Sequence, residues 1–146
     1  MIEVAGLTKH YANIRAVDDV SFTVQTGEVV GFLGPNGAGK TTTMKMITGA
    51  IPADGGSVKV AGYDVFEHPM EVKGRTGYLP ENPPVYLDMT VTDYLRFVGA
   101  IKGLGGRKLS AQVDSSMGRC NITAVAGRLI GNLSKGFKQR VGIAQA

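Results

Sequence analysis

Apolar and polar residues alternate along the first part of the chain. The alternating apolar positions are Ile2 and Val4 within residues 2–11, and Val20, Phe22 and Val24 within residues 20–25. A period of two places successive side chains on opposite faces of a strand, so this pattern predicts two half-buried antiparallel strands. Asp18 and Asp19 lie between them and predict a turn.

Residues 29–33 (VVGFL) change the pattern, because no polar side chain interrupts them. A continuous apolar run of this kind predicts a strand that is buried on both faces of a parallel sheet. In residues 40–50 (KTTTMKMITGA), apolar side chains recur at helical spacing until Gly49 and Pro52. This segment therefore predicts a helix, which follows the buried strand after a glycine-rich connection.

Two later segments carry strand signals. Residues 56–65 (GSVKVAGYDV) predict a strand that is opened by the turn at residues 54–56. Residues 76–86 (TGYLPENPPVY) predict a short strand that runs into a loop, because the prolines exclude a helix.

The pattern becomes helical from about residue 90 onward. A stripe at positions i, i+3, i+4 and i+7 is formed by Val91, Tyr94, Leu95 and Val98. Thr90 is the predicted cap of this helix, Ser110 and Thr123 are predicted caps of two more, and residues 102–110 are predicted to form a loop. The sequence therefore divides into a β-rich lobe, residues 1–88, and a helical lobe, residues 89–146.

The charge balance and the cysteine count narrow the function classes. The chain carries 16 Lys and Arg residues against 12 Asp and Glu residues, a formal net charge of +4. This mild excess suits a phosphate-bearing ligand, but no block of basic residues indicates a nucleic-acid partner. The single cysteine, Cys120, excludes an internal disulfide and indicates a reducing compartment. No apolar run approaches the roughly 18 residues of a membrane span, so we expect a cytoplasmic protein.

Residues 34–41 (GPNGAGKT) match the phosphate-loop pattern G-x-x-x-x-G-K-[ST] between the predicted buried strand and the predicted helix. Glycines let backbone N–H groups turn inward onto an anion, and the start of a helix adds unpaired N–H groups and a positive dipole end. Lys40 supplies charge for the outer phosphates, Thr41 suits Mg²⁺, and Thr42 adds a hydroxyl for an inner phosphate. The predicted phosphate-binding residues are Gly34, Pro35, Asn36, Gly37, Ala38, Gly39, Lys40, Thr41 and Thr42. The alternative is a glycine-rich turn with an exposed lysine.

A phosphate loop is shared by GTPases, kinases, motors and transporters, so other motifs must select among them. The guanine-binding string N-K-x-D is absent. The segments that carry a family resemblance are residues 10–22 (HYANIRAVDDVSF), 77–86 (GYLPENPPVY) and 132–146 (NLSKGFKQRVGIAQA). The chain resembles the nucleotide-binding domain of ATP-binding-cassette (ABC) transporters, and its sequence is most similar to bacterial export-type members.

This resemblance implies an α/β fold: a P-loop NTPase core of the ABC ATPase type with an antiparallel β subdomain and a helical subdomain. Residues 1–88 then form the nucleotide-binding core with its phosphate loop and β subdomain. Residues 89–146 form the helical subdomain and the start of the signature helix.

The resemblance also assigns two residues outside the phosphate loop. Tyr11 takes the position of the aromatic ring that stacks on adenine; the alternative is a surface tyrosine at the end of a strand. Glu81 stands where the family has Gln, in a loop that senses Mg²⁺ and the attacking water and contacts the membrane subunit. A carboxylate there can bind Mg²⁺, although it adds negative charge near the γ-phosphate. The alternative for Glu81 is an exposed loop acid.

Ser134 and Gly136 match the family signature L-S-G-G-Q, in which Lys135 and Phe137 replace Gly and Gln. Ser134 is also a predicted helix N-cap, and the N–H groups behind it suit an anion. In the family this anion is the γ-phosphate of an ATP held by a second nucleotide-binding domain, so that two half-sites close over two nucleotides. The alternative is an ordinary cap on an amphipathic helix.

Hydrolysis in the family requires an acidic strand, the Walker B strand, and a catalytic Glu that both follow the signature helix. The sequence ends inside that helix. The segment that most resembles a Walker B strand, residues 84–88 (PVYLD), has no Glu after Asp88. We therefore expect an N-terminal portion, truncated before the Walker B strand, that binds ATP and Mg²⁺ without efficient hydrolysis. Residues 29–33 are then expected to form an unpaired apolar edge.

The function that the resemblance implies is that of an ATP-binding subunit of an ABC transporter, an exporter, which couples Mg·ATP binding and hydrolysis to transport. Its implied partners are a second nucleotide-binding domain and a transmembrane permease, at the inner face of the cell membrane, with no nucleic acid. One alternative is a soluble ABC ATPase that acts on ribosomes or DNA. Another is a nucleotide-binding module without catalysis.

Overall fold

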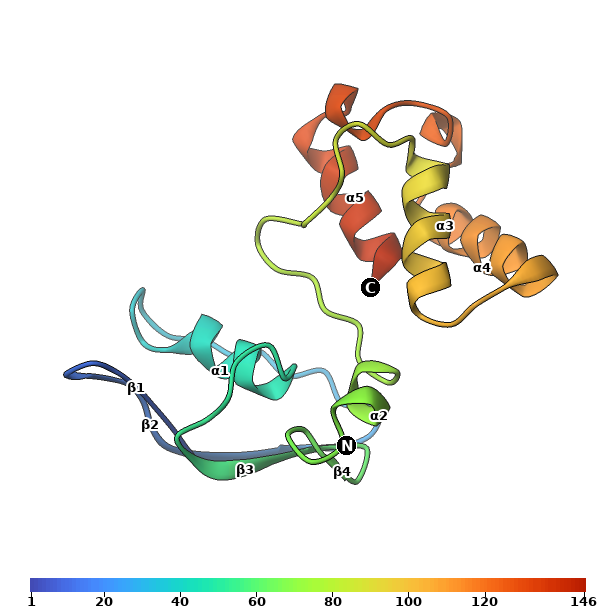
Figure 1. The fold of residues 1–146 in the computed structure, drawn as a ribbon. Coiled ribbons are helices and arrows are strands. Elements are labelled where there is room, and N and C mark those ends of the chain that lie inside the picture. The colour runs from blue at the N-terminus through green and yellow to red at the C-terminus, as the bar shows by residue number, and fades with distance from the viewer. The chain divides into compact units, whose positions relative to one another are not determined.

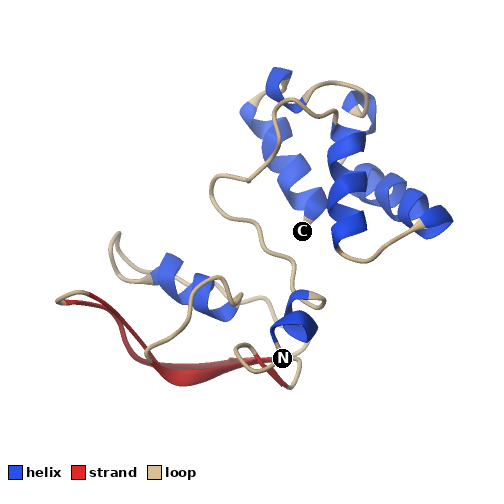
Figure 2. Cartoon of the chain, in the orientation of Figure 1, coloured by secondary structure: helices blue, strands red, loops and turns tan.

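The computed structural model describes all residues from Met1 to Ala146 and contains two compact units, Met1–Thr76 and Gly77–Ala146. Every strand belongs to the first unit, and the second unit contains only helices and loops (Figure 2). The sequence-based division lies after residue 88, whereas residues 77–88 belong to the helical unit in the structure. The phosphate-loop segment and the signature segment therefore lie in different units.

The first unit is built on an antiparallel sheet with the strand order β2-β1-β3-β4 (Figure 1). Its strands are β1 (Ile2–Tyr11), β2 (Ile14–Val24), β3 (Gly55–Val60) and β4 (Tyr63–Asp64). Val4 of β1 pairs with Phe22 of β2 and with Val58 of β3, and its side chain is buried. The alternation of apolar residues therefore gave a correct prediction of antiparallel strands for β1 and β2.

Asp18 and Asp19 do not form the predicted turn, because they lie within β2. The chain reverses earlier, at Ala12, which adopts a left-handed φ of 50°. Asp19 has a φ of 49°, and its N–H donates a hydrogen bond of 3.2 Å to the Thr8 hydroxyl, where the pairing of β1 and β2 is irregular. The two acidic residues thus occupy a β-bulge on an edge strand, where their carboxylates remain in water.

Residues 56–65 form a hairpin rather than the single strand predicted. Ala61 and Gly62 have φ values of 50° and 85°, and they join β3 to β4. Two successive left-handed residues match the twist of a two-residue hairpin turn. Val60 accordingly pairs with Tyr63 across the turn.

Helix α1 (Lys40–Ile47) covers one face of the sheet (Figure 1), and α2 (Pro69–Lys73), which the sequence did not predict, follows β4. The buried apolar side chains of this unit are Val4, Leu7, Val17, Met46, Ile47, Val58, Val60, Val65 and Val72. Thr43 of α1 is buried as well, and its hydroxyl donates a hydrogen bond of 3.0 Å to the Gly39 carbonyl. The predicted helix is therefore confirmed. Burial of Thr43, Met46 and Ile47 against the sheet holds α1 in place.

The prediction of a buried strand at residues 29–33 is wrong for this structure. The segment has no regular secondary structure, and Val29 and Leu33 are 99% and 92% exposed. Only Phe32 finds an aromatic partner, with its ring centroid 5.6 Å from that of Phe22. No strand of residues 1–146 pairs with this segment, so its backbone N–H and C=O groups have no ladder to join.

The second unit contains three helices, α3 (Val91–Ile101), α4 (Gly106–Arg119) and α5 (Lys135–Gln145), together with short 3₁₀ turns at Thr123–Val125 and Ile130–Asn132. The predicted cap of α3 is confirmed. The Thr90 hydroxyl accepts a hydrogen bond of 3.1 Å from the Asp93 N–H and donates one of 2.7 Å to the Asp93 carboxylate. This reciprocal arrangement satisfies one of the free N–H groups of the first turn.

The other two predicted caps are wrong. Ser110 lies inside α4, which begins directly after the extended Gly105, so half of the predicted loop at residues 102–110 is helical. Residues 107–109 (Arg, Lys, Leu) are good helix formers, and they carry the helix back to the glycine. Thr123 is the first residue of a 3₁₀ turn and caps no α-helix.

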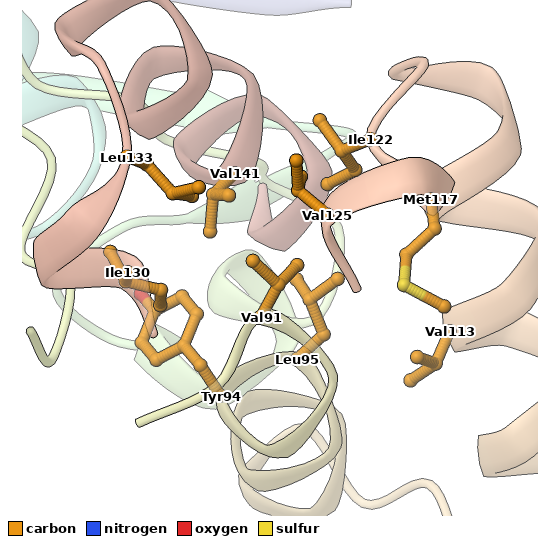
Figure 3. Close-up of a cluster of buried hydrophobic side chains, with 10 residues drawn as sticks. All are labelled: Val91, Tyr94, Leu95, Val113, Met117, Ile122, Val125, Ile130, Leu133 and Val141. Atoms are coloured by element: carbon orange, nitrogen blue, oxygen red, sulfur yellow. The ribbon is translucent and has the colours of Figure 1, made fainter. Parts of the chain in front are cut away.

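The helical unit has its own apolar core (Figure 3). Its buried members are Val91, Tyr94, Leu95, Val113, Met117, Ile122, Val125, Ile130, Leu133 and Val141. Burial raises the pKa of Tyr94, helped by the neighbouring Tyr86, and the Tyr94 hydroxyl donates a hydrogen bond of 3.3 Å to the Pro84 carbonyl. This bond ties the proline-rich segment at residues 76–86, which forms the predicted loop but not the predicted short strand, to α3.

Replacing Asp54 with asparagine should reduce the stability of the full-length gene product at neutral pH, and this loss should shrink as the pH falls below 3.8. The Lys9 ammonium, 2.8 Å from the carboxylate, and the His10 backbone N–H lower the pKa of Asp54 from its ordinary value of 3.8. The stabilisation is therefore present above the ordinary pKa and lost as the pH falls through the lower folded-state value. Melting temperatures of both proteins from pH 7 to pH 3 test this, and a constant difference would contradict it.

Candidate functional site

The predicted phosphate loop connects residues 29–33, which are exposed apart from the half-buried Phe32, to α1. Gly37 and Gly39 have left-handed φ values of 82° and 81°, which residues with a Cβ atom adopt only at a cost. A Cβ atom on Gly39 would also overlap with the Ala16 carbonyl of β2. Gly39 is therefore required both for the backbone conformation and for the close approach of the loop to the sheet.

Helix α1 begins at Lys40, immediately after this left-handed glycine, and no side chain caps its N-terminus. The N–H groups of the first turn consequently remain free for an external acceptor. Thr41 at this end is exposed and Thr42 is half-buried. The loop positions Gly34, Pro35, Asn36, Gly37 and Ala38 are all exposed.

The Lys40 ammonium lies folded over the loop. Its Nζ donates hydrogen bonds of 2.7 Å to the Gly34 carbonyl and 2.6 Å to the Pro35 carbonyl. No carboxylate forms an ion pair with it. The positive charge is therefore held at the loop by neutral acceptors, which an incoming anion can replace.

The donors of the loop fit a triphosphate with its metal ion. Free N–H groups at the start of a helix, an ammonium without a counter-ion and an exposed hydroxyl at Thr41 are the groups that such a ligand uses. The missing side chain of Gly39 lets the loop and the start of α1 lie close against β2. By contrast, no group of three or more His, Cys, Asp or Glu side chains forms a metal site of its own.

Tyr11 lies at the end of β1 and is 48% exposed. The Lys9 ammonium lies 5.9 Å from its ring centroid, so the ring already accepts one cation–π contact. Ala16, which Gly39 approaches, lies on β2 just beyond the β1–β2 turn that follows Tyr11. The ring is thus half-exposed at the end of its strand, and its stacking on a base stays a prediction.

The remaining site predictions fall in the helical unit. Glu81 is exposed in the loop before α3, and its backbone carbonyl accepts a hydrogen bond of 2.9 Å from Gln139 Nε2 of α5. Ser134 is the N-cap of α5, because its hydroxyl accepts a hydrogen bond of 3.4 Å from the Phe137 N–H. Gly136 is exposed in the first turn behind this cap. The capping role of Ser134 is thus confirmed, whereas its contact with a phosphate stays a prediction.

A groove of about 460 Å³ runs between the Glu81 loop and the start of α5. It is lined by Asn82, Pro83, Val85, Leu87, Lys135, Lys138 and Gln139. Two lysines and no acidic residue line it, so the groove is positively charged beside Ser134. Thr41 and Glu81, the two predicted Mg²⁺ ligands, belong to different units.

Sequence reasoning missed Gln139 and Gln145 of α5, whose side chains bind the loop that carries Glu81. Their amides donate to backbone carbonyls. Because every residue has a backbone carbonyl, the residue types of the partners do not reveal these contacts. The only available signal was their helical spacing with Gly142, a small residue between two amides on one face of the helix.

Comparisons with known proteins agree over nearly the whole chain. The family model described as ABC transporter matches residues 17–146. The chain is 38% identical over 146 residues to the uncharacterized ABC transporter ATP-binding protein YxlF of Bacillus subtilis (strain 168), covering 100% of this chain and 48% of that protein. It is 35% identical over 146 residues to the bacitracin transport ATP-binding protein BcrA of Bacillus licheniformis, covering 100% of this chain and 47% of that protein.

A solved structure described as the ATP binding subunit of an ABC transporter matches with a TM-score of 0.88 and 30% sequence identity, covering 99% of this chain and 60% of that chain. The chain spans about half the length of the two curated Bacillus relatives. None of its helices combines the length and the apolar character needed to cross a membrane. The matched family model and the shared structure show that the chain belongs to the ABC transporter family and has the α/β fold of its ATP-binding subunits.

Proposed function

We propose that the full-length gene product is the ATP-binding subunit of an ABC exporter, which couples the binding and hydrolysis of Mg·ATP to transport. The observation that carries this proposal is the loop at residues 34–42, where free N–H groups, a left-handed Gly39 and the Lys40 ammonium converge. Relatives described as ATP-binding proteins of transporters, including one for bacitracin, support the coupling to transport. For residues 1–146 themselves we propose nucleotide binding.

The residues of the first unit then act together on one nucleotide. The Lys40 ammonium leaves the Gly34 and Pro35 carbonyls and neutralises the outer phosphates, while the N–H groups at the start of α1 hold the inner ones. Thr41 supplies a hydroxyl ligand to Mg²⁺, which neutralises phosphate charge when bound. Tyr11 stacks on the adenine ring.

The residues of the helical unit serve a second nucleotide-binding domain and the membrane partner. Ser134 and Gly136 present the N-terminus of α5 to the γ-phosphate of an ATP held by the second domain, and Lys135 adds charge to this contact. Glu81 orients Mg²⁺ or water at its own nucleotide. The Glu81 loop and the helical unit contact a transmembrane permease, which places the protein at the inner face of the cell membrane.

Two measurements on the full-length gene product test this proposal. We expect steady-state hydrolysis that requires Mg²⁺ and prefers ATP to GTP, and we expect affinity purification from membranes in mild detergent to recover a multispan membrane protein. A preference for GTP would overturn the assignment of the nucleotide. Recovery of ribosomes in place of a membrane protein would overturn the assignment to transport.

A further inference from the structure

One face of α5 is attached to the loop that carries Glu81. Gln139 Nε2 donates a hydrogen bond of 2.9 Å to the Glu81 carbonyl, and Gln145 Nε2 donates one of 3.1 Å to the Tyr78 carbonyl. The two glutamines are six positions apart and bind carbonyls three positions apart. The loop therefore runs along the helix and is held at two points.

Gly142 lies between these two hydrogen bonds and lets the loop approach the helix closely. A Cβ atom at Gly142 would lie 2.7 Å from Leu79 Cδ1 and 2.8 Å from Pro83 Cβ. Gly142 is buried. Because the Pro83 ring is rigid, the helix and the loop fit against each other only when this side chain is absent.

The loop has no regular secondary structure that would fix its position on the helix. Residues 76–86 form no strand or helix, and the prolines at 80, 83 and 84 remove backbone donors. Its position is set from outside, by the two glutamines of α5 on one side and by the Tyr94 hydroxyl on Pro84. The loop and α5 are thus packed as one body within the helical unit.

We propose that Gln139 is a positioning residue, which fixes Glu81 to α5 so that any displacement of the helix is passed to the Glu81 carboxylate. This inference rests on the proposed function of Glu81 at the nucleotide, and it adds a mechanical link between Ser134 and Glu81. Both ends of the link lie in one unit: Ser134 caps the helix that Gln139 belongs to. Any displacement of α5 that an anion at its N-terminus causes is therefore passed to the backbone of Glu81.

The link is tested first by a measurement that does not depend on hydrolysis. Glu-specific protease cleaves after Glu81 only when the loop leaves the helix, so the cleavage rate reports the strength of the attachment. Gln139→Met in the full-length gene product keeps the length of the side chain and removes the donor. We expect cleavage after Glu81 to become about two- to tenfold faster, the factor that one lost hydrogen bond supplies, while cleavage after Glu28 stays unchanged.

Two further variants serve as controls. Gln112→Met makes the same replacement at an exposed position of α4 and should leave cleavage after Glu81 unchanged. Gln139→Lys keeps a donor at the same place and should restore most of the protection. If Gln139→Met left the cleavage after Glu81 at the wild-type rate, the attachment would be disproved, whether or not the protein hydrolyses ATP.

The consequence for the reaction is tested by kinetics on the same variants. We expect Gln139→Met to lower kcat for ATP by at least about threefold with little change in KM, because a misplaced Glu81 affects the reacting phosphate and not the binding of the nucleotide. Gln139→Lys should recover kcat. A wild-type kcat in a variant whose loop is cleaved faster would overturn the positioning role, and an absence of hydrolysis in the wild type would overturn the proposed function instead.

Discussion

Replacing Lys40 with alanine should weaken the binding of Mg·ATP to the full-length gene product by about 10- to 150-fold, the range that one or two charge-assisted hydrogen bonds supply. The ammonium is the only formal positive charge in the phosphate loop, residues 34–41. In the structure it is held by the Gly34 and Pro35 carbonyls, at 2.7 and 2.6 Å. Calorimetric titration with Mg·ATP measures the effect.

The loss of binding should not come from a loss of fold. Gly34 and Pro35 are exposed, so water can replace Lys40 at their carbonyls, and the melting temperature of the variant should stay close to that of the wild type. Lys45→Ala is the matched control, since Lys45 is an exposed lysine in the last turn of the same helix. Equal affinities for the Lys40 and Lys45 variants would show that the Lys40 ammonium does not hold the phosphates.

Replacing Gly39 with alanine should be among the most damaging single changes in the first unit. The left-handed φ of 81° costs an alanine about 1 to 2 kcal/mol, and the overlap of its Cβ atom with the Ala16 carbonyl costs about 1 to 3 kcal/mol more. We therefore expect a loss of about 2 to 5 kcal/mol in the free energy of unfolding of this unit, with a displaced loop that binds Mg·ATP poorly. Urea denaturation measures the free energy of unfolding, and the fluorescence of an added nucleotide analogue measures the binding.

Gly37→Ala separates the two causes. Gly37 has nearly the same φ of 82°, but a Cβ atom there would meet nothing within 4 Å. This variant should therefore lose only the conformational term, about 1 to 2 kcal/mol. If the two alanine variants were equally stable, the close approach of Gly39 to the Ala16 carbonyl of β2 would contribute nothing to the stability of the loop.

The parts of the fold that were predicted correctly are those that depend on short-range signals. Alternation of Ile2 and Val4 predicted β1, helical spacing from Lys40 predicted α1, and Thr90 and Ser134 were recognised as caps because a hydroxyl three residues before a free N–H is sufficient for a cap. The order of motifs also predicted the family, which the matched family model confirms.

The parts that were predicted wrongly depend on more than the local pattern of each segment. Residues 29–33 have the composition of a buried strand, but a strand also needs a neighbour for its backbone groups, and no strand in residues 1–146 pairs with them. Ser110 has the chemistry of a cap, but the residues before it favour helix and Gly105 ends the loop first. The first segment lacks a pairing partner in residues 1–146, and at the second the helix-forming residues before Ser110 decide where the helix begins.

The candidate site shows the same division. The phosphate loop could be proposed from the sequence because phosphate binding requires particular residue types at fixed spacing, and its role stays a prediction. The attachment of Glu81 to α5 could not, because Gln139 and Gln145 bind backbone carbonyls across 58 and 67 positions of sequence. Contacts of this kind are specified by the packing of Gly142 against Leu79 and Pro83, which only the folded chain reveals.

The central claim is that the backbone amides of residues 36–42 and the Lys40 ammonium hold the triphosphate of ATP. Hydrogen exchange of the full-length gene product, with and without saturating Mg·ATP, tests it most directly, because amides that donate to phosphate oxygens stop exchanging with solvent. We expect strong protection of the peptide that spans residues 34–42 and no change across residues 106–119 of α4. Unchanged exchange in residues 34–42 at saturating Mg·ATP would contradict the claim.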